Sequence, residues 1–357
     1  MAAARAPYME WAKKRAAAKI DLAASDLSPC SLDDLPGARE AVDIAGQPDG
    51  HPPLLEAIAA RYGVTPDRVA TAGGCSGANF LACAAVLETG DDVLVERPGY
   101  DPLAAAARML GGRVRFFERR FEEGYAIDPE GVSAALTPAT RLIVVSNPHN
   151  PTGVLASEES LQALARLAEK AGALVLVDEV YQDTVLRGRQ PPAATRSPVF
   201  LSTNSLTKAY GLSPLRCGWV LGSPELIERI RRARDVVDNY GPVPSDRLAA
   251  VAFANLDRLG QRARAIIEPN SRMVTEFFAG RPDLESVPSR STLAFPRLAG
   301  RSDAGPFVER LFGADGVAVA PGSFFDAPAH FRIAFGGGTE KLRAGLEAIG
   351  RCLGVSP

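Results

Sequence analysis

The sequence predicts an α/β fold, in which helices cover both faces of a mostly parallel sheet, followed by a smaller α+β unit. Short runs rich in β-branched residues alternate with helical segments from about residue 50 to residue 222. This alternation is typical of strand–helix–strand units, whose strands pair in parallel. After Pro224 long helical stretches replace it. With 357 residues the chain also exceeds the size at which a single core stops growing, so we expect two domains.

The composition limits the classes of ligand. Hydrophobic residues make up 46% of the chain, and 40 Lys and Arg against 42 Asp and Glu give a formal net charge of −2. Because the charges are mixed along the chain, we expect small-molecule ligands and no nucleic acid or membrane partner. The five cysteines are scattered without a C-x-x-C pair. This pattern excludes a simple disulfide framework and a zinc knuckle, predicts no metal site and favours the cytoplasm.

Residues 1–45 are predicted to form an N-terminal segment that packs with the small domain. A helix or arm is expected within residues 1–20, with Tyr8 and Trp11 on one side. No continuous apolar run follows Met1, so we expect no secretory signal. A short strand begins at Ile20, and a loop containing Pro and Ser follows it.

A large domain is expected over residues 46–250. Its predicted strands are 68–71, 92–96, 113–117, 141–146, 173–177, 199–202 and 218–222. The helices between them include residues 53–61, which Gly63 ends, and residues 157–171, whose apolar residues share one face. In sheets of this kind ligands bind beyond the carboxyl ends of the strands. The loops at those ends are therefore the first places to look for a site.

A small C-terminal domain is expected over residues 251–357. Helical patterns cover residues 226–237 and 245–280, and Pro269 should kink or end the second. Short strands are expected at 292–295, 316–320 and 330–334, and a closing helix at 339–353.

The stretch from Ser202 to Trp219 contains the residue types that hold an aldehyde cofactor and its phosphate. An amine forms a Schiff base only when it is partly unprotonated, and burial beside other cations would lower the pKa of Lys208 in that direction. Arg216, eight residues on, could supply that charge and grip a phosphate, to which Ser205 could add a hydroxyl. Alone, a lysine after a Ser/Thr run is more often a solvated loop residue. The interpretation depends on partners elsewhere.

Two such partners follow neighbouring predicted strands. Asn150 lies in an Asn-Pro-His-Asn-Pro-Thr-Gly loop and could donate a hydrogen bond to a phenolic oxygen. Asp178 ends the next strand, where a carboxylate against a pyridine nitrogen would keep that nitrogen protonated, and Tyr181 could join Asn150 at the oxygen. The structural alternatives are an ordinary Asn-Pro turn and a helix N-cap.

Three further features fit the same ligand. The turn at Gly74, Cys75 and Ser76 opens a helix, where free backbone N–H groups attract a phosphate. Tyr100 could lie flat on an aromatic ring or simply cap the core. Arg332, in an apolar strand, needs a bidentate partner, which a substrate carboxylate or an internal acid would provide equally well.

The order of these motifs resembles that of the class I/II aminotransferases, which are pyridoxal 5′-phosphate (PLP)-dependent enzymes of fold type I in the aspartate aminotransferase superfamily. The resemblance spans about residues 45–350 and is carried by Pro-x-Tyr, Asn-Pro-His-Asn-Pro-Thr-Gly, Asp-Glu-x-Tyr, Ser-Leu-Thr-Lys and a late Phe-Arg-Ile. It implies a fold type I PLP-dependent transferase. It also implies a homodimer that moves an amino group between an amino acid and a 2-oxo acid.

The resemblance also assigns roles. Lys208 would bind the cofactor aldehyde as a Schiff base and act as the base, Asp178 would pair with the pyridine nitrogen, and Asn150 and Tyr181 would hold the ring oxygen. Tyr100 would stack on the ring, and Arg332, with Asn150 beside it, would receive the substrate α-carboxylate. The phosphate would be held by Gly74, Cys75, Ser76, Ser205 and Arg216.

The chain departs from this family at two positions. Ala45 stands where many relatives have a tyrosine that reaches the neighbouring subunit's phosphate, and Ser25-Asp26 stands where relatives tend to have a glycine. A PLP lyase or decarboxylase on the same scaffold is the alternative enzyme, since its cofactor-holding residues would be identical. A non-catalytic PLP-binding module is the alternative outside the enzymes.

Overall fold

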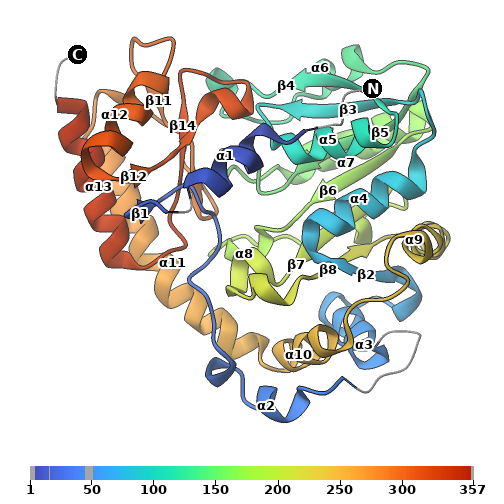
Figure 1. Cartoon of the computed structure of the whole chain (residues 1–357). Helices are drawn as coiled ribbons and strands as arrows, with labels where there is room; N and C mark the ends of the chain where they lie inside the picture. The colour runs from blue at the N-terminus through green and yellow to red at the C-terminus, as the bar shows by residue number, and fades with distance from the viewer. Residues whose placement is uncertain (1–4, 16, 45–50, 355–357) are drawn as a thin grey trace.

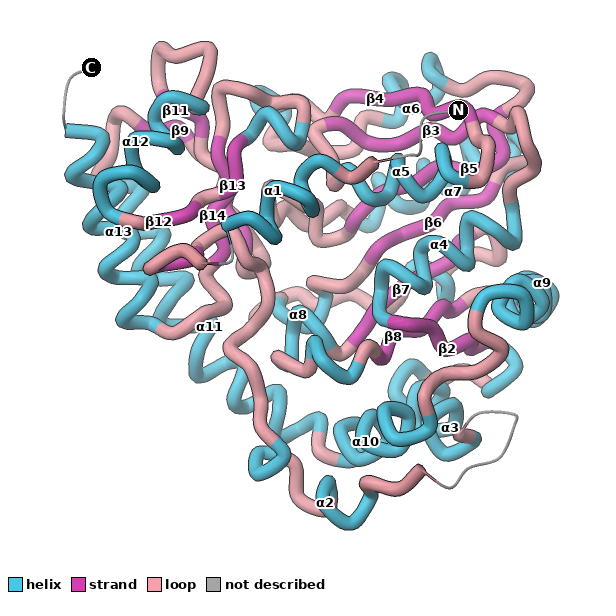
Figure 2. Tube along the Cα trace, viewed as in Figure 1, coloured by secondary structure: helices cyan, strands magenta, loops and turns pink. Residues whose placement is uncertain are grey.

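The computed structural model describes residues 5–15, 17–44 and 51–354, so Ala45 lies outside the described residues. Its centre is a seven-stranded sheet with the strand order β2-β8-β7-β6-β5-β3-β4 (Figures 1 and 2). The strands are β2 (Val69–Gly73), β3 (Asp92–Arg97), β4 (Arg113–Glu118), β5 (Thr140–Ser146), β6 (Leu174–Asp178), β7 (Phe200–Ser205) and β8 (Cys217–Leu221). Only β8 runs against its neighbours β2 and β7. The predicted α/β fold with a mostly parallel sheet is confirmed.

Strand residues alternate between two hydrophobic cores, one on each face of the sheet. Val93 and Val95 pack on one face, and Leu94 between them packs on the other. The first face is covered by α4 (Gly74–Val86), α5 (Asp101–Met109) and α9 (Pro224–Val237), and the second by α6 (Pro129–Ala135) and α7 (Glu158–Ala171). The β2–β8 end packs against α3 (Pro52–Tyr62) and α10 (Val243–Ala254). Burial on both faces explains why the strands are almost continuously apolar.

A second unit lies beside the sheet, at the left of Figure 1. It contains α11 (Leu256–Ala279), β9 (Leu284–Glu285), β10 (Leu293–Ala294), β11 (Arg297–Leu298), α12 (Gly305–Asp315), β12 (Val317–Ala318), β13 (Ala320–Pro321), β14 (Phe331–Ala334) and α13 (Thr339–Gly354). Its own core gathers apolar side chains of α11, α12, β14 and α13. The expected short strands and closing helix are present.

A kink or an end of the helix was predicted at Pro269, and the helix does not end there. Pro269 lies inside α11, which continues to Ala279. Buried residues hold the helix on both sides of it: Ile267 packs in a small core, and Asn270 donates hydrogen bonds to the carbonyl oxygens of Phe335 (2.8 Å) and Gly337 (2.9 Å). These tertiary contacts outweigh the backbone hydrogen bond that proline cannot donate.

The N-terminal segment joins this second unit. Helix α1 (Pro7–Arg15) carries Tyr8 and Trp11, whose stacked rings lie 6.2 Å apart, as the predicted shared face requires. Strand β1 (Ile20–Asp21) pairs in parallel with β12. The chain then crosses to α2 (Ala38–Ala41) near α10 (Figure 1). Residues 23–27 are thereby placed between the second unit and the sheet.

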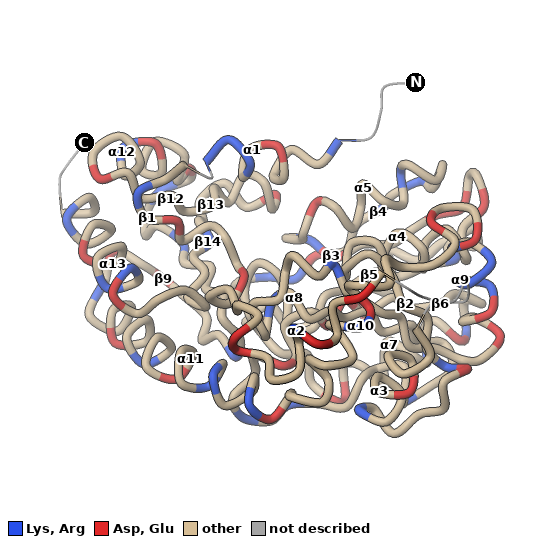
Figure 3. The backbone as a smooth tube through the Cα atoms, turned by 60° about the horizontal axis from the view of Figure 1, so that its bottom comes forward, with Lys and Arg blue, Asp and Glu red and all other residues tan. Residues whose placement is uncertain are grey.

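Lys and Arg residues are interspersed with Asp and Glu residues along the backbone (Figure 3). In the described ranges no helix is both long and apolar enough to cross a bilayer. The same residues contain no group of three or more His, Cys, Asp or Glu arranged to hold a metal ion.

Candidate active site

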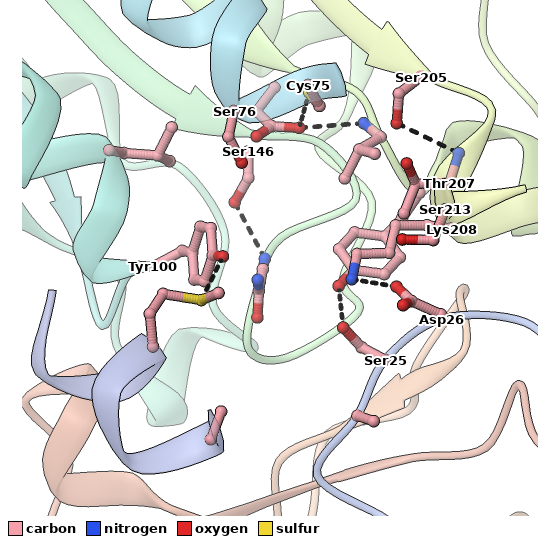
Figure 4. Close-up of a pocket in the computed structure, with 18 of the residues that line it drawn as sticks. Ser25, Asp26, Cys75, Ser76, Tyr100, Ser146, Ser205, Thr207, Lys208 and Ser213 are labelled. Carbon is pink, nitrogen blue, oxygen red and sulfur yellow. Dashed lines mark hydrogen bonds and ion pairs between the residues drawn. The ribbon is translucent and has the colours of Figure 1, made fainter. Parts of the chain in front are cut away.

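A cavity of about 270 Å³ lies at the carboxyl edge of the sheet. Five strands end at this edge: β2, β3, β5, β6 and β7. The antiparallel β8 begins there, so Arg216, the residue before β8, lies at the same edge. The lining includes Cys75, Ser76, Tyr100, Asn150, Asp178, Tyr181, Ser205, Lys208 and Arg216 (Figure 4). Of the predicted site residues, Gly74 and Arg332 lie directly behind this lining.

Lys208 lies in the short helix α8 (Thr207–Tyr210), and its Nζ forms an ion pair with the Asp26 carboxylate (Figure 4). Burial disfavours the ammonium ion, but Tyr181 and Asp26 outweigh it and raise the pKa of Lys208 above its ordinary value. Arg216 donates instead to the carbonyl oxygens of Gly73 (3.3 Å) and Ser213 (3.4 Å). The expectation of a lysine pKa lowered by a neighbouring cation is wrong for this structure, because the neighbour is an anion.

Asp178 ends β6 and is 5% exposed. Its Oδ2 accepts a hydrogen bond from Asn79 Nδ2 at 2.8 Å, and its Oδ1 accepts from the Val180 N–H at 3.1 Å and from Cys75 Sγ at 3.4 Å. Burial raises the pKa of Asp178, and these donors counteract the rise. Asn79 was missed in the sequence, although an asparagine on the apolar face of helix α4 was a signal for it. Thr203 Oγ1 donates to Asn79 Oδ1 at 2.6 Å and thereby orients the side-chain amide.

Asn150 is positioned by a buried ion pair. Glu96, at the end of β3, pairs with Arg119 at 2.7 Å, and both side chains have no exposed surface. Glu96 also accepts from the Ser146 N–H at 2.6 Å, and Ser146 Oγ accepts from the Asn150 N–H at 2.9 Å. The chain of contacts from Glu96 through Ser146 fixes the loop that carries Asn150.

Arg332 in β14 is fully buried and has three partners. Its Nη1 donates to Asn150 Oδ1 at 2.8 Å, and its Nη2 donates to the Ala23 carbonyl at 2.7 Å and to the Tyr8 hydroxyl. The Tyr8 ring also lies 5.0 Å from the guanidinium carbon. Within the described ranges, the buried Nε has no hydrogen-bond partner. Tyr8 and Asn150 thus separate Arg332 from the cavity, and no Asp or Glu among the described residues is bonded to Arg332.

The hydroxyl groups of Tyr100 and Tyr181 are bonded to residues of the N-terminal segment. Tyr181 donates from its hydroxyl to Ser25 Oγ at 2.7 Å. Tyr100 donates to Met9 Sδ at 3.2 Å, and its ring meets that of Tyr8 edge-on at 5.9 Å. The contact between the Tyr8 hydroxyl and Arg332 could not be predicted from the sequence, because the two residues lie 324 positions apart in the chain.

At the other end of the cavity the backbone leaves no room for side chains. Gly74 has φ +75° at the start of α4, and a Cβ there would collide with the guanidinium of Arg216. A Cβ on Gly218 would collide with the backbone of Gly74. Ser76 and Ser205 line the cavity beside this turn. A helix start, an arginine and hydroxyl groups are all groups that can donate hydrogen bonds to an anion.

Comparison with known proteins gives the same family. The model of "aminotransferase class I and II" matches residues 20–349. The chain is 33% identical to capreomycidine synthase of Streptomyces vinaceus (98% of this chain, 94% of that one). It is 33% identical to aspartate/prephenate aminotransferase of Thermus thermophilus (86% and 82%).

A crystal structure of a PLP-dependent aminotransferase from Streptococcus suis superposes with a TM-score of 0.92 at 26% identity, over 99% of this chain and 98% of that one. The fold, the order of the motifs and these similarities agree. The chain belongs to the class I and II aminotransferases and is a PLP-dependent aminotransferase of fold type I.

Proposed function

We propose that the cavity residues hold PLP as the sequence motifs imply, with Lys208 binding the aldehyde. The observation that carries the proposal is that an amine, a buried carboxylate, and an arginine with two serine hydroxyl groups line one cavity. When bound, PLP supplies an aldehyde that condenses with amines and a protonated pyridine ring that accepts an electron pair from the α-carbon. The described residues offer a partner for each part of this group.

Asp178 fits the pyridine nitrogen. Its carboxylate lines the cavity, and Asn79, Cys75 and Val180 already orient it. A buried carboxylate whose pKa is raised by burial becomes stable as an anion beside a pyridinium cation. Asn150 and Tyr181 would hold the ring oxygen, and Tyr100 would stack on the ring.

The turn at Gly74 fits the phosphate. The open backbone there, Arg216 and the hydroxyl groups of Ser76 and Ser205 offer donors for a dianion, and Cys75 would contribute its backbone N–H. Substitution of Gly74 by any larger residue would remove this space.

Arg332 would bind the substrate α-carboxylate, and Lys208 would carry the α-proton. The free Nε of Arg332 and its lack of an acidic partner support this role. Tyr8 would have to yield its hydrogen bond to the incoming carboxylate. Lys208 must lose its own proton before it can remove one from the substrate. Fixing the α-carbon between these two groups selects proton loss.

Substitution of Lys208 by alanine tests the proposal. Purified protein with PLP is expected to show a visible absorbance band, which Lys208→Ala removes and the exposed control Lys341→Ala retains. Amino acids should then convert the band with release of a 2-oxo acid and formation of pyridoxamine 5′-phosphate. A band that survives in Lys208→Ala would refute the assignment of this lysine.

A second candidate reaction is supported by the similarity to capreomycidine synthase over nearly the whole chain. In such a reaction the same residues would bind the amino acid, but the amino group would stay on the product. Product analysis separates the candidates: an amino acid product without pyridoxamine indicates a synthase, ammonia with a 2-oxo acid a lyase, and carbon dioxide a decarboxylase.

We also propose a three-part organisation of the chain. The parallel pairing of β1 with β12 supports an N-terminal segment that belongs with the small domain. The predicted boundary at residue 250 falls inside α10, which packs on α3, so we place it at Asn255 between α10 and α11. A homodimer is supported by the exposed apolar side chains of Val236 and Val237 at the end of α9. The five free cysteines suit the cytoplasm.

A further inference from the structure

One charged residue of the cavity has no part in the proposed reaction. The charged side chains that line the cavity are Asp26, Asp178, Lys208 and Arg216. The proposed function uses the last three for the pyridine nitrogen, the aldehyde and the phosphate. Asp26 remains, and its side chain is 39% exposed.

The position of Asp26 is fixed from both sides. The carbonyl of Ala23 accepts from Arg332 at 2.7 Å, and Ser25 Oγ accepts from Tyr181 at 2.7 Å. On the other side, the Leu27 N–H donates to the Lys208 carbonyl at 3.1 Å. The carboxylate of Asp26 therefore has a defined place in the cavity.

That place is within reach of a bound amino acid. Three peptide bonds separate the Cα atoms of Ala23, which contacts Arg332, and Asp26, so these atoms are at most about 11 Å apart. Lys208, which would act on the α-carbon of an amino acid held by Arg332, is the present partner of Asp26. Met9, Ala12 and Leu103 line the same cavity and can contact the methylene groups of a long side chain.

The charges around Asp26 disfavour an anionic side chain. Among the described residues that line the cavity, Lys208 and Arg216 are the cations, and both are assigned to the cofactor. A second carboxylate on the substrate would meet Asp26 without a cation to bind it. Two like charges in a partly buried site repel each other.

We propose that Asp26 binds a cationic group on the substrate side chain, so that the site takes amino acids with an ammonium or guanidinium group and rejects dicarboxylic ones. The inference rests on the proposed function, because it requires Lys208 and Arg332 in their assigned places. In the PLP-loaded enzyme the cofactor aldehyde takes up Lys208, which leaves the Asp26 carboxylate free for a cation of the substrate. Since Asp26 contributes to the raised pKa of Lys208, its pairing with the substrate cation also favours the neutral amine that must act as the base once Lys208 is released.

A charge series of α-methyl amino acids tests the proposal in the PLP-loaded enzyme. These compounds lack the α-proton, so the change in cofactor absorbance reports binding without amino transfer. The dissociation constant of α-methylornithine is expected to lie about tenfold below that of α-methylglutamine, and that of α-methylglutamate should be the highest. Equal constants, or tightest binding of the anion, would overturn the inference.

Variants of Asp26 test whether this residue causes the difference between the dissociation constants. Asp26→Asn should bring the constants of the cationic and neutral compounds within about twofold of each other, and Asp26→Glu should keep their order. Asp33→Asn, which removes an exposed carboxylate from the same segment, is the matched control and should behave as the unchanged enzyme. An unchanged order in Asp26→Asn would assign the selectivity to another residue and refute the proposal.

The series also separates this inference from the proposed function. If the predicted order appears but no amino acid yields pyridoxamine 5′-phosphate, transamination fails and the role of Asp26 stands. If amino transfer occurs but the order is absent, the inference alone is refuted.

Discussion

Arg332 shows how a single buried residue can be prepared for a ligand. A guanidinium ion without exposed surface requires partners for its donors. In the part of the chain that the structure describes, these are an amide oxygen, a hydroxyl and a carbonyl, but no carboxylate. Its positive charge therefore remains uncompensated by these partners. A substrate carboxylate would supply both the negative charge and two acceptor atoms.

Replacement of Arg332 by lysine should weaken substrate binding much more than cofactor binding. Lysine keeps the charge but loses the planar pair of donors, so we expect a loss of about 100-fold in kcat/KM, mostly through KM. Tyr8→Phe is the control, because it removes one hydroxyl partner of Arg332 and leaves the guanidinium in place. Its effect should stay within about threefold. Steady-state kinetics and the absorbance of bound PLP measure the two effects. A normal KM in Arg332→Lys would refute the carboxylate role.

At the residue scale the sequence predicted which residues form the candidate site, but not which residues contact them in the folded chain. The motifs located Lys208 and Asp178, which do line one cavity. They did not reveal that an anion contacts Lys208, because Asp26 is 182 residues away in the chain. The same holds for Asn79, which contacts Asp178 across 99 residues. The pKa of a group depends on such neighbours, so its direction could not be predicted from local sequence.

At the scale of elements, the proposed phosphate site depends on the close approach of β8 to the β2–α4 turn. Gly218 in β8 pairs with Ala72, and its α-carbon faces the backbone of Gly74. The sheet register thus fixes the turn, and the absence of a side chain at residue 218 makes the contact possible.

Gly218→Ala should therefore destabilise the protein and weaken cofactor binding together. Overpacking against backbone atoms costs about 1–3 kcal/mol in the free energy of unfolding, and displacement of the turn should raise the dissociation constant for PLP. Gly77→Ala, one turn into α4, is the matched control. A Cβ there has its nearest neighbour at 3.8 Å, and alanine favours the helix by up to about 1 kcal/mol. Denaturant titration and absorbance titration with PLP measure both quantities. Equal behaviour of the two variants would refute the role of the contact.

Periodicity predicted the elements well where burial was regular. The alternating apolar residues of β3 and β5 pack on the two faces as expected. The predicted ends of elements were less accurate where tertiary contacts outweigh the local preference of the residues. Strand β7 extends to Ser205, beyond the predicted end at residue 202, because its polar residues 203–205 pair with β8. Pro269 was accommodated for the same reason, by contacts on both sides of it.

At the scale of the whole molecule, the N-terminal segment completes the site. Tyr8, Ser25 and Asp26 reach the cavity from a segment whose strand β1 pairs with β12, almost 300 residues later. Pairing at this distance is set by the assembled fold, so the sequence predicted that the segment packs with the small domain but not which strand it pairs with.

A buried histidine joins segments far apart in the chain. The ring of His330 stacks on Phe295 at 4.7 Å, and its Nε2 lies 2.9 Å from the Tyr125 hydroxyl. Burial, with a smaller effect of the Arg297 charge, lowers the pKa of His330 to about 4. The folded protein therefore keeps this imidazole neutral at a pH at which the unfolded chain binds a proton.

The sign of the pH dependence follows from this difference. The stability that neutral His330 contributes is fully present above its unfolded pKa of about 6.5 and is lost as the pH falls from there toward 4. Between pH 7 and pH 5 the loss from this residue amounts to at most about 2 kcal/mol. Asp101 and Asp246, whose pKa values burial raises to about 6, act in the opposite direction, so the total pH dependence does not isolate His330.

A comparison of two proteins isolates it. His330→Gln cannot take up the proton, so its free energy of unfolding should fall less between pH 7 and pH 5 than that of the unchanged protein. The destabilisation caused by the substitution should thus be smaller at pH 5, and it should be constant between pH 7 and pH 8, where the imidazole is neutral in both states. Denaturant titrations at the three pH values measure these differences. An equal destabilisation at pH 5 and pH 7 would show that His330 titrates alike in the folded and unfolded chains, and that the contact between Phe295, Tyr125 and His330 does not keep water from the ring.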